Sequence, residues 1–161
     1  MRRRSLLLAL VAVILVVVLD QASKQWILQF FDDTPGRLVP LTGFLNLALI
    51  FNHGISFGVL NNAGPLNALI FTVLAVVIVA GLVAWLWRSD GFLLPAAIGM
   101  VIGGAVGNVV DRLARGAVTD FLDFHLGEWH WFVFNLADAA ICVGVGLMVI
   151  DSLVGRREAP R

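Results

Sequence analysis

Charged residues are scarce in this sequence. Only 14% of its 161 residues are charged, whereas 60% are hydrophobic, and the mean hydropathy is +0.93. A soluble domain usually carries about 25% charged residues, so the composition argues against a soluble protein and indicates an integral membrane protein. The formal net charge is zero, which gives no reason to expect nucleic acid or an acidic partner.

Cysteine is also scarce, and several common catalytic motifs are absent. The single cysteine, Cys142, excludes an intramolecular disulfide and a CxxC metal or redox site. Because Cys142 lies in an apolar run, we expect a buried structural thiol. The sequence has no serine nucleophile elbow, no HExxH motif and no Cys–His arrangement, so none of these supplies a nucleophile.

Long apolar runs, by contrast, dominate the chain. Four of them are long enough to cross a bilayer. We predict an all-α membrane protein of one domain, residues 1–161, with transmembrane helices at about 5–27, 66–87, 92–110 and 131–154. The first run follows basic residues and also resembles a secretory signal peptide, but no small-x-small cleavage site closes it. We therefore expect it to be retained as a helix.

Two segments between these runs differ from them. Residues 31–64 mix apolar residues with turn-forming and polar ones, which predicts a partly extended or amphipathic segment at the membrane surface. Residues 111–130 form a polar connection between the last two spans. Within the third span Gly99, Gly103 and Gly107 recur every four residues, and this stripe of small residues lets another helix approach closely.

The basic residues predict how the chain crosses the membrane. With both termini cytoplasmic, the inner side holds seven basic residues and the outer side four, and the positive-inside rule favours this topology. The segment between the first two spans and the polar connection then both face the outside.

One carboxylate falls inside a predicted span. Asp138 follows Trp131, the expected start of the fourth span, by about two helical turns, near 10 Å. An ionisable side chain at that depth costs several kcal/mol, which marks it as a candidate functional residue. Asn135 shares its helical face, one turn earlier. In the first span Asp20 and Lys24 are four residues apart and can pair, either as a structural ion pair or as part of a site.

The end of the third span carries a second polar group. Asn108, Asp111 and Arg112 lie on one helical face by their i,i+3 and i,i+4 spacings. We expect Asp111 to be structural, because Arg112 and Arg115 are near enough in sequence to neutralise it.

Two carboxylates in one site can share a proton. Like charge and a low dielectric raise the pKa of one group while the other stays ionised. The resulting acid and base can activate a water molecule and protonate a leaving amine, which is peptide hydrolysis. Asp120, in the polar connection, is the expected partner of Asp138 at the same outer depth.

Other interpretations stay open at this point. A buried aspartate pair also suits a proton relay or a cation site. Asp111, Asp120 and Asp123 suggest a Mg²⁺-dependent phospholipid headgroup transferase. His125 and His130 follow no common spacing of metal ligands, so we expect no metal and no cofactor.

Five short motifs occur in order along nearly the whole chain: Asp20-Gln21-xx-Lys24, Asn52-His53-Gly54-xx-Phe57, Gly107-Asn108-xx-Asp111-Arg112, Val118-Thr119-Asp120-Phe121 and Phe134-Asn135-Leu136-Ala137-Asp138. Together with the length and the four-span layout, they resemble the signature of the lipoprotein signal peptidases (signal peptidase II).

The resemblance implies an aspartyl endopeptidase of the bacterial inner membrane. Such an enzyme removes the signal peptide of prolipoproteins on the amino side of a diacylglyceryl-modified cysteine. The family's catalytic dyad falls on Asp120 and Asp138, and Asn52 and Gly54 match the segment that holds the substrate. The positions that frame the site match Asn108, Asp111, Arg112 and Asn135. The expected partners are the lipid-modified prolipoprotein and membrane lipids, for a monomer whose site faces the periplasm.

Overall fold

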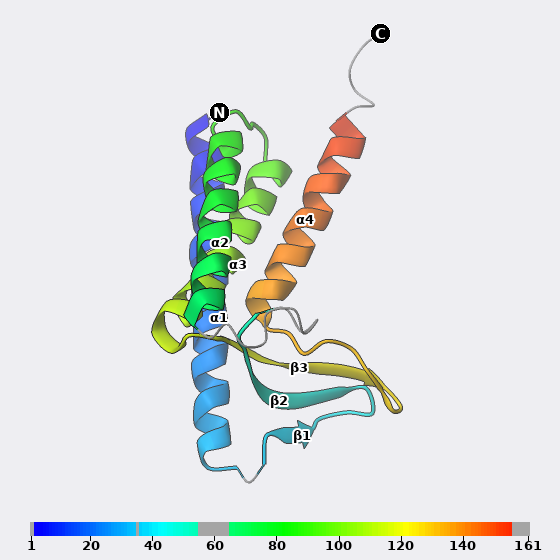
Figure 1. The fold of residues 1–161 in the computed structure, drawn as a ribbon. Helices are drawn as coiled ribbons and strands as arrows, with labels where there is room; N and C mark the ends of the chain where they lie inside the picture. Colours follow the sequence, from blue (N-terminus) through cyan, green and yellow to red (C-terminus); the bar gives the residue numbers. More distant parts are fainter. Residues whose placement is uncertain (1, 35, 55–64, 156–161) are drawn as a thin grey trace.

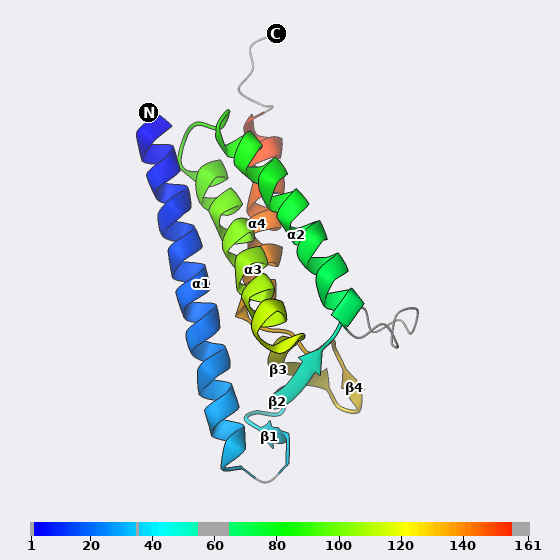
Figure 2. The same ribbon diagram turned by 60° about the vertical axis from the view of Figure 1, so that its left-hand side comes forward.

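Four helices form a bundle in the computed structural model, which describes residues 2–34, 36–54 and 65–155 (Figure 1). They are α1 (Arg2–Asp32), α2 (Pro65–Leu86), α3 (Leu93–Arg115) and α4 (Leu136–Gly155). Helix α3 packs against the other three (Figure 2). All four helices are long and apolar enough to cross a membrane, which confirms the four predicted spans. The start of α1 and the end of α4 lie at the same end of the bundle (Figure 1).

The glycine stripe of α3 is where the helices come closest. A methyl group added at Gly99 would lie 2.5 Å from the backbone oxygen of Ala9, and one added at Gly103 would lie 2.8 Å from Val16. Both neighbours belong to α1. On another side of α3, Gly104 leaves the same kind of room for α4. The predicted role of the stripe in close helix packing is confirmed.

A small antiparallel sheet covers the other end of the bundle (Figures 1 and 2). Its strands lie in the order β1 (Leu38–Pro40), β2 (Leu45–Asn52), β3 (Val118–Leu126) and β4 (Trp129–His130). The segment after α1 is thus extended, as expected, up to the end of β2, and its residues 55–64 lie outside the described part of the chain. The polar connection after α3 is a strand, because its backbone pairs with β2 about 70 residues earlier in the chain, a contact that local pattern does not reveal.

Packing on the sheet lengthens α1. The sequence predicted an end near residue 27, but the helix continues to Asp32. Ile27 and Phe31, one turn apart, are buried against Leu47 and Phe121 of the sheet. The last turns of α1 are therefore stabilised by burial of apolar surface.

The facing ends of α3 and α4 also differ from the prediction. Helix α3 runs past residue 110 to Arg115 and ends at Gly116, whose φ of 75° and N–H bond to the Arg112 carbonyl form a left-handed cap. Helix α4 begins at Leu136 rather than near residue 131, because the preceding residues are extended and pair with β3. Asp138 therefore lies in the first turn of α4, and the expectation of two turns of depth was wrong.

The outer faces of the helices carry many exposed apolar side chains, as a lipid environment requires. Cys142 is among the exposed residues of α4. The expectation of a buried thiol was therefore wrong, since an apolar run in a membrane protein can face lipid instead of the protein core.

Candidate active site

Polar side chains from α1, α3, α4 and the sheet meet where the bundle joins the sheet. Six of the predicted site residues are buried there: Asp20, Lys24, Asn108, Asp111, Asp120 and Asn135. Four are partly exposed: Asn52, Gly54, Arg112 and Asp138. Through direct contacts or shared neighbours, the structure brings all ten predicted residues into one region.

Asp120 lies on β3 and is 2% exposed. Asn135 donates a hydrogen bond from Nδ2 to Asp120 Oδ1 at 2.6 Å, and Asn52 donates from Nδ2 to Oδ2 at 3.0 Å. Burial raises the pKa of Asp120 to about 6, and the nearby charge of Asp138 adds to that rise, although both asparagine bonds oppose it. Asp120 is thus suited to exchange a proton near pH 6.

Asp138 is held at the start of α4 by a capping box. Asn135 is the N-cap residue: its Oδ1 accepts the Asp138 N–H at 3.0 Å, while its own N–H donates to Asp138 Oδ2 at 3.2 Å. The other carboxylate oxygen accepts a bond of 2.8 Å from Asn108 Nδ2. These bonds fix the position of the Asp138 side chain in the first turn of α4.

Three asparagine amides surround the two aspartates in the same manner. Asn52, Asn108 and Asn135 each donate from Nδ2 to Asp120 or Asp138. Each also has its Oδ1 held by a donor: the Gly54 N–H at 3.0 Å, the Lys24 ammonium at 3.1 Å and the Asp138 N–H at 3.0 Å respectively. The amide –NH₂ groups are thereby aimed at the carboxylates.

A second cluster lies behind these amides. The fully buried Lys24 ammonium contacts Asp20 Oδ2 at 2.8 Å and Asp111 Oδ2 at 3.5 Å. Arg115 pairs with Asp111 Oδ1 at 2.9 Å. Asp111 also accepts the Thr119 N–H at 2.8 Å, which ties the end of α3 to β3. The interpretation of Asp111 as structural fits this geometry, with Arg115 and Lys24 as its ion partners.

Asp20 connects the first helix to the last. Its Oδ1 accepts a bond of 3.0 Å from the backbone N–H of Ala137, in the first turn of α4. That N–H has no partner within its own helix, so Asp20 acts as a cap supplied by another helix. Gly107 makes room for this contact, because a methyl group there would lie 2.5 Å from Asp20 Oδ2.

Arg112 of α3 lies near three of the aspartates. Its guanidinium interacts electrostatically first with Asp138, then with Asp120 and Asp111, and it lies 5.2 Å from the centre of the Phe71 ring. The region as a whole then contains four carboxylates (Asp20, Asp111, Asp120 and Asp138) and three cationic side chains (Lys24, Arg112 and Arg115). One negative charge is in excess, and one proton bound by the cluster would neutralise it.

Gly54 closes the end of β2 next to α2. Its φ is +148°, and a methyl group there would lie 2.8 Å from the Phe71 ring. Both facts favour glycine. A larger residue would displace the backbone N–H that holds Asn52, and so disturb the donor to Asp120.

Gln21 is a member of the site that residue-by-residue reasoning did not select. It donates from Nε2 to Asp20 Oδ2 and to the Gly107 carbonyl, each at 3.1 Å. Its place inside the first motif, directly after Asp20, was the available indication.

Asp123 belongs to a different cluster, nearer the tip of the sheet. It is 1% exposed and accepts a bond of 2.8 Å from Asn46, its direct partner on β2. His130 Nδ1 lies 2.9 Å from Asp123 Oδ1, and the His130 ring stacks on His125. Burial opposes ionisation here, but the bonds from Asn46 and His130 outweigh it and lower the pKa of Asp123.

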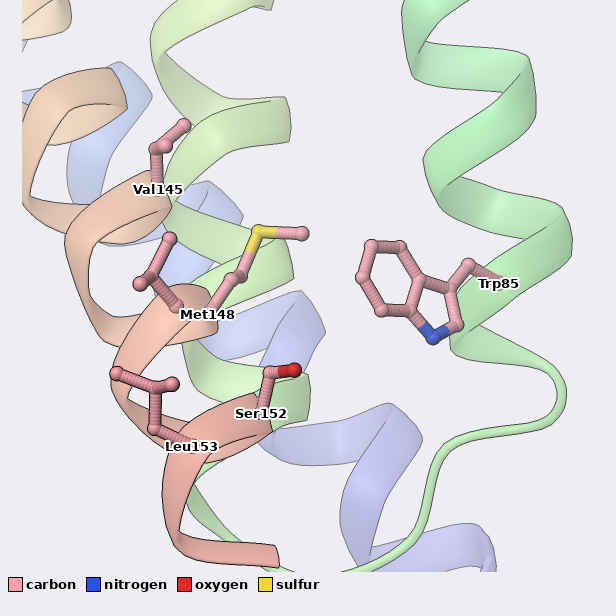
Figure 3. A pocket seen from close by; sticks show the side chains of 6 residues that line it. Trp85, Val145, Met148, Ser152 and Leu153 are labelled. Atoms are coloured by element: carbon pink, nitrogen blue, oxygen red, sulfur yellow. The ribbon is translucent and has the colours of Figure 1, made fainter. Parts of the chain in front are cut away.

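A cavity of about 410 Å³ lies at the other end of the molecule, between α2 and α4 (Figure 3). Trp85 of α2 faces Met148 and Ser152 of α4 across it (Figure 3). Its lining is largely apolar, and it contains none of the site residues.

Known proteins give an independent view of the whole chain. The family described as signal peptidase (SPase) II matches residues 12–154. The chain is 42% identical over 156 residues to the lipoprotein signal peptidase of Methylorubrum extorquens (strain PA1), covering 94% of this chain and 87% of that one. It is 47% identical over 146 residues to that of Azoarcus sp. (strain BH72), covering 90% and 82%.

Solved structures agree with the fold. Two structures are described as a "bacterial membrane enzyme" determined by the in meso method. One has a TM-score of 0.78 at 25% identity and covers 95% of this chain and 92% of its own. The other has a TM-score of 0.77 at 27% identity and covers 90% and 92%. The chain therefore belongs to the signal peptidase II family, membrane-spanning aspartic peptidases that process prolipoproteins.

Proposed function

We propose that Asp120 and Asp138 are the catalytic pair of this peptidase and activate a water molecule between them. The arrangement of the two carboxylates carries the proposal. They come from different elements, they share Asn135 as a hydrogen-bond donor, and one negative charge is in excess around them. Such a pair holds one proton between its members before the reaction starts.

In this mechanism Asp138 starts as the carboxylate and Asp120 as the acid. Asp138 takes a proton from water as the water oxygen attacks the scissile carbonyl carbon, and Asp120 gives its proton to the carbonyl oxygen. The tetrahedral intermediate collapses when Asp138 passes its proton to the leaving nitrogen and Asp120 recovers one from a hydroxyl. The C–N bond breaks, and both side chains return to their starting states.

The substrate of this reaction is a prolipoprotein cleaved on the amino side of its lipid-modified cysteine. A site at the end of four membrane-spanning helices can receive a substrate that carries both an apolar signal helix and lipid chains. Asn52 and Gly54, which are partly exposed at the end of β2 beside Asp120, are the residues we assign to substrate binding. We propose a monomer that needs no metal, cofactor or nucleic acid.

The cleavage test uses a purified lipidated prolipoprotein in detergent or vesicles. Asp120→Asn and Asp138→Asn each keep the side-chain shape but remove the proton exchange, so each should abolish detectable cleavage while the melting temperature stays near that of the wild type. The same prolipoprotein without its lipid is the substrate control and should be cleaved much more slowly. Turnover within tenfold of wild type in either variant would contradict the dyad.

We also propose a bacterial inner-membrane location with both termini cytoplasmic and the site toward the periplasm. The distribution of basic residues along the sequence, seven on the cytoplasmic side of this topology and four on the outer side, supports it. Exposed aromatic side chains at the sheet end, Trp26, Trp129 and Trp131 among them, suit an outer interface.

Orientation is tested by thiol labelling in a Cys142→Ser background. Glu128→Cys, at the exposed tip of the sheet, should react in intact cells with a membrane-impermeant reagent. Asp90→Cys, exposed in the α2–α3 loop, should react only after lysis. The reverse pattern would overturn the topology.

A further inference from the structure

The three asparagine amides of the site differ in how their orientation is set. Asn52 is held by the N–H of Gly54, two residues away, and Asn135 by the N–H of Asp138, three residues away. Both anchors are backbone groups that form with the local turn or cap. The anchor of Asn108 is a side chain of another helix, Lys24 of α1.

Lys24 has the hydrogen-bond donors and the surroundings that are needed to orient the Asn108 amide. An ammonium has three N–H groups and no acceptor. Three acceptor oxygens surround it: Asp20 Oδ2 at 2.8 Å, Asn108 Oδ1 at 3.1 Å and Asp111 Oδ2 at 3.5 Å. Lys24 is completely buried. Only the oxygen of the Asn108 amide can face it, so the –NH₂ must point away, toward Asp138.

Without this anchor, the Asn108 amide could rotate. Its remaining contact at Oδ1 is the long bond of 3.3 Å from Asn135 Nδ2. A rotation by half a turn would place Oδ1 against Asp138 Oδ1, and two acceptors in contact repel each other. Asp138 would then lose a donor bond of 2.8 Å and a defined position.

We propose that Lys24 is a positioning residue of the peptidase, which fixes the amide of Asn108 so that its –NH₂ group always faces Asp138. The inference rests on the proposed function of Asp138. Lys24 does not touch the substrate in this scheme. It acts through one amide, and its removal should lower kcat and leave KM nearly unchanged.

The first test is Lys24→Met, which keeps an unbranched side chain of similar length without the ammonium. We expect kcat on a lipidated prolipoprotein to fall by roughly 10²-fold, the loss typical of a catalytic group displaced by about 1 Å, with KM within about twofold of the wild type. Ser23→Ala is the matched control. Ser23 is partly exposed, and its hydroxyl donates to the Asp20 carbonyl on the same helix, so the kinetics of Ser23→Ala should be unchanged.

A double-mutant cycle separates positioning from general stability. If Lys24 acts through Asn108, Lys24→Met should cause no further loss of kcat in an Asn108→Ala background. Losses that multiply would show an independent role and overturn the proposal. So would a wild-type kcat in Lys24→Met.

Folding is controlled by a second variant. Lys24→Met leaves Asp20 buried without its ion partner. In Asp20→Asn/Lys24→Met that charge is gone and an oxygen remains to accept the Ala137 N–H, so the melting temperature should recover while kcat stays low. Recovery of kcat together with stability would overturn the proposal. A wild-type protein that cleaves no prolipoprotein would instead refute the proposed function itself, and the two failures are thereby distinguished.

Discussion

Asp120 and Asp123 are three residues apart on the same strand, and both are buried, yet their carboxyl groups behave in opposite ways. Each accepts a hydrogen bond from an asparagine of β2, Asn52 for Asp120 and Asn46 for Asp123. The pKa of Asp120 is raised to about 6, whereas that of Asp123 is lowered. Burial raises the pKa at both positions and an asparagine bond lowers it at both, so the direction of each shift depends on the balance of these effects with the neighbouring charges.

The neighbouring charges add to the difference between the two positions. The charge of Asp138, the second carboxylate of the site, opposes ionisation of Asp120. The group next to Asp123 is the imidazole of His130, which supports ionisation. A nearby like charge raises the pKa of a carboxyl group, which favours proton exchange. A nearby imidazole that can become a cation lowers the pKa, which favours a structural carboxylate.

The largest expected effect comes from exchanging each aspartate for asparagine. Asp120→Asn should lower kcat/KM by at least about 10³-fold, since it removes an acid–base group. Asp123→Asn should leave kcat/KM within about threefold of the wild type. Both are measured on the same lipidated prolipoprotein, with thermal unfolding to show that each variant is folded. A large loss in Asp123→Asn would place that residue in the reaction and remove the contrast.

The pH dependence of activity should reflect the ionisation of Asp120 and not that of Asp123. In the proposed mechanism the pair carries one proton, and kcat/KM should therefore fall as the pH rises through about 6, where Asp120 loses its proton. Asn52→Ala removes a bond that lowers the pKa of Asp120, so it should move this alkaline limb to higher pH. Asn46→Ala is the matched change beside Asp123 and should not move it. A limb shifted equally by both substitutions would contradict the comparison.

Stability should respond to pH with opposite signs at the two sites. The pKa of Asp120 is higher in the folded state, so its ionisation destabilises the fold as the pH rises from about 4 to about 6. The pKa of Asp123 is lower in the folded state, so its contribution is lost as the pH falls below about 4. The dependence of the melting temperature on pH should therefore become flatter between pH 4 and 6 in Asp120→Asn, and below pH 4 in Asp123→Asn. The reverse assignment would contradict the two shifts.

The smallest effect is expected from His130→Gln. The His130 side chain is 48% exposed, and such partly solvated ion pairs contribute about 1 kcal/mol or less. We expect a decrease of a few degrees in melting temperature and normal cleavage. Loss of cleavage in a folded His130→Gln protein would extend the active site to the tip of the sheet.

Much of the fold could be predicted because membrane-spanning helices are recognised from the length and apolar composition of their sequences. The four apolar runs and the glycine stripe were enough to give the helices and their close packing. The helix ends were not predictable in the same way, because they depend on partners far away in the chain. Helix α1 continues to Asp32 because the sheet covers its last turns. Helix α4 starts only at Leu136 because the residues before it pair with β3.

The members of the site were predicted better than its internal order. Motifs indicated ten residues, and all ten lie together. Which donor faces which oxygen could not be predicted, since Lys24, Asn108 and Asn135 come from three helices and meet only after packing. The depth of Asp138 was wrong for the same reason: the cap at Asn135, and not the first apolar residue, determines where the helix begins.

The bond between Asp20 and the Ala137 N–H has a consequence for biosynthesis. It joins α1 to α4, the first and last of the four described helices. A chain interrupted before α4 lacks both this bond and Asp138, so under the proposed mechanism it cannot hydrolyse a peptide bond. Under that mechanism the peptidase becomes active only once α4 has joined the bundle, and chains interrupted earlier pose no proteolytic risk to the membrane that holds them.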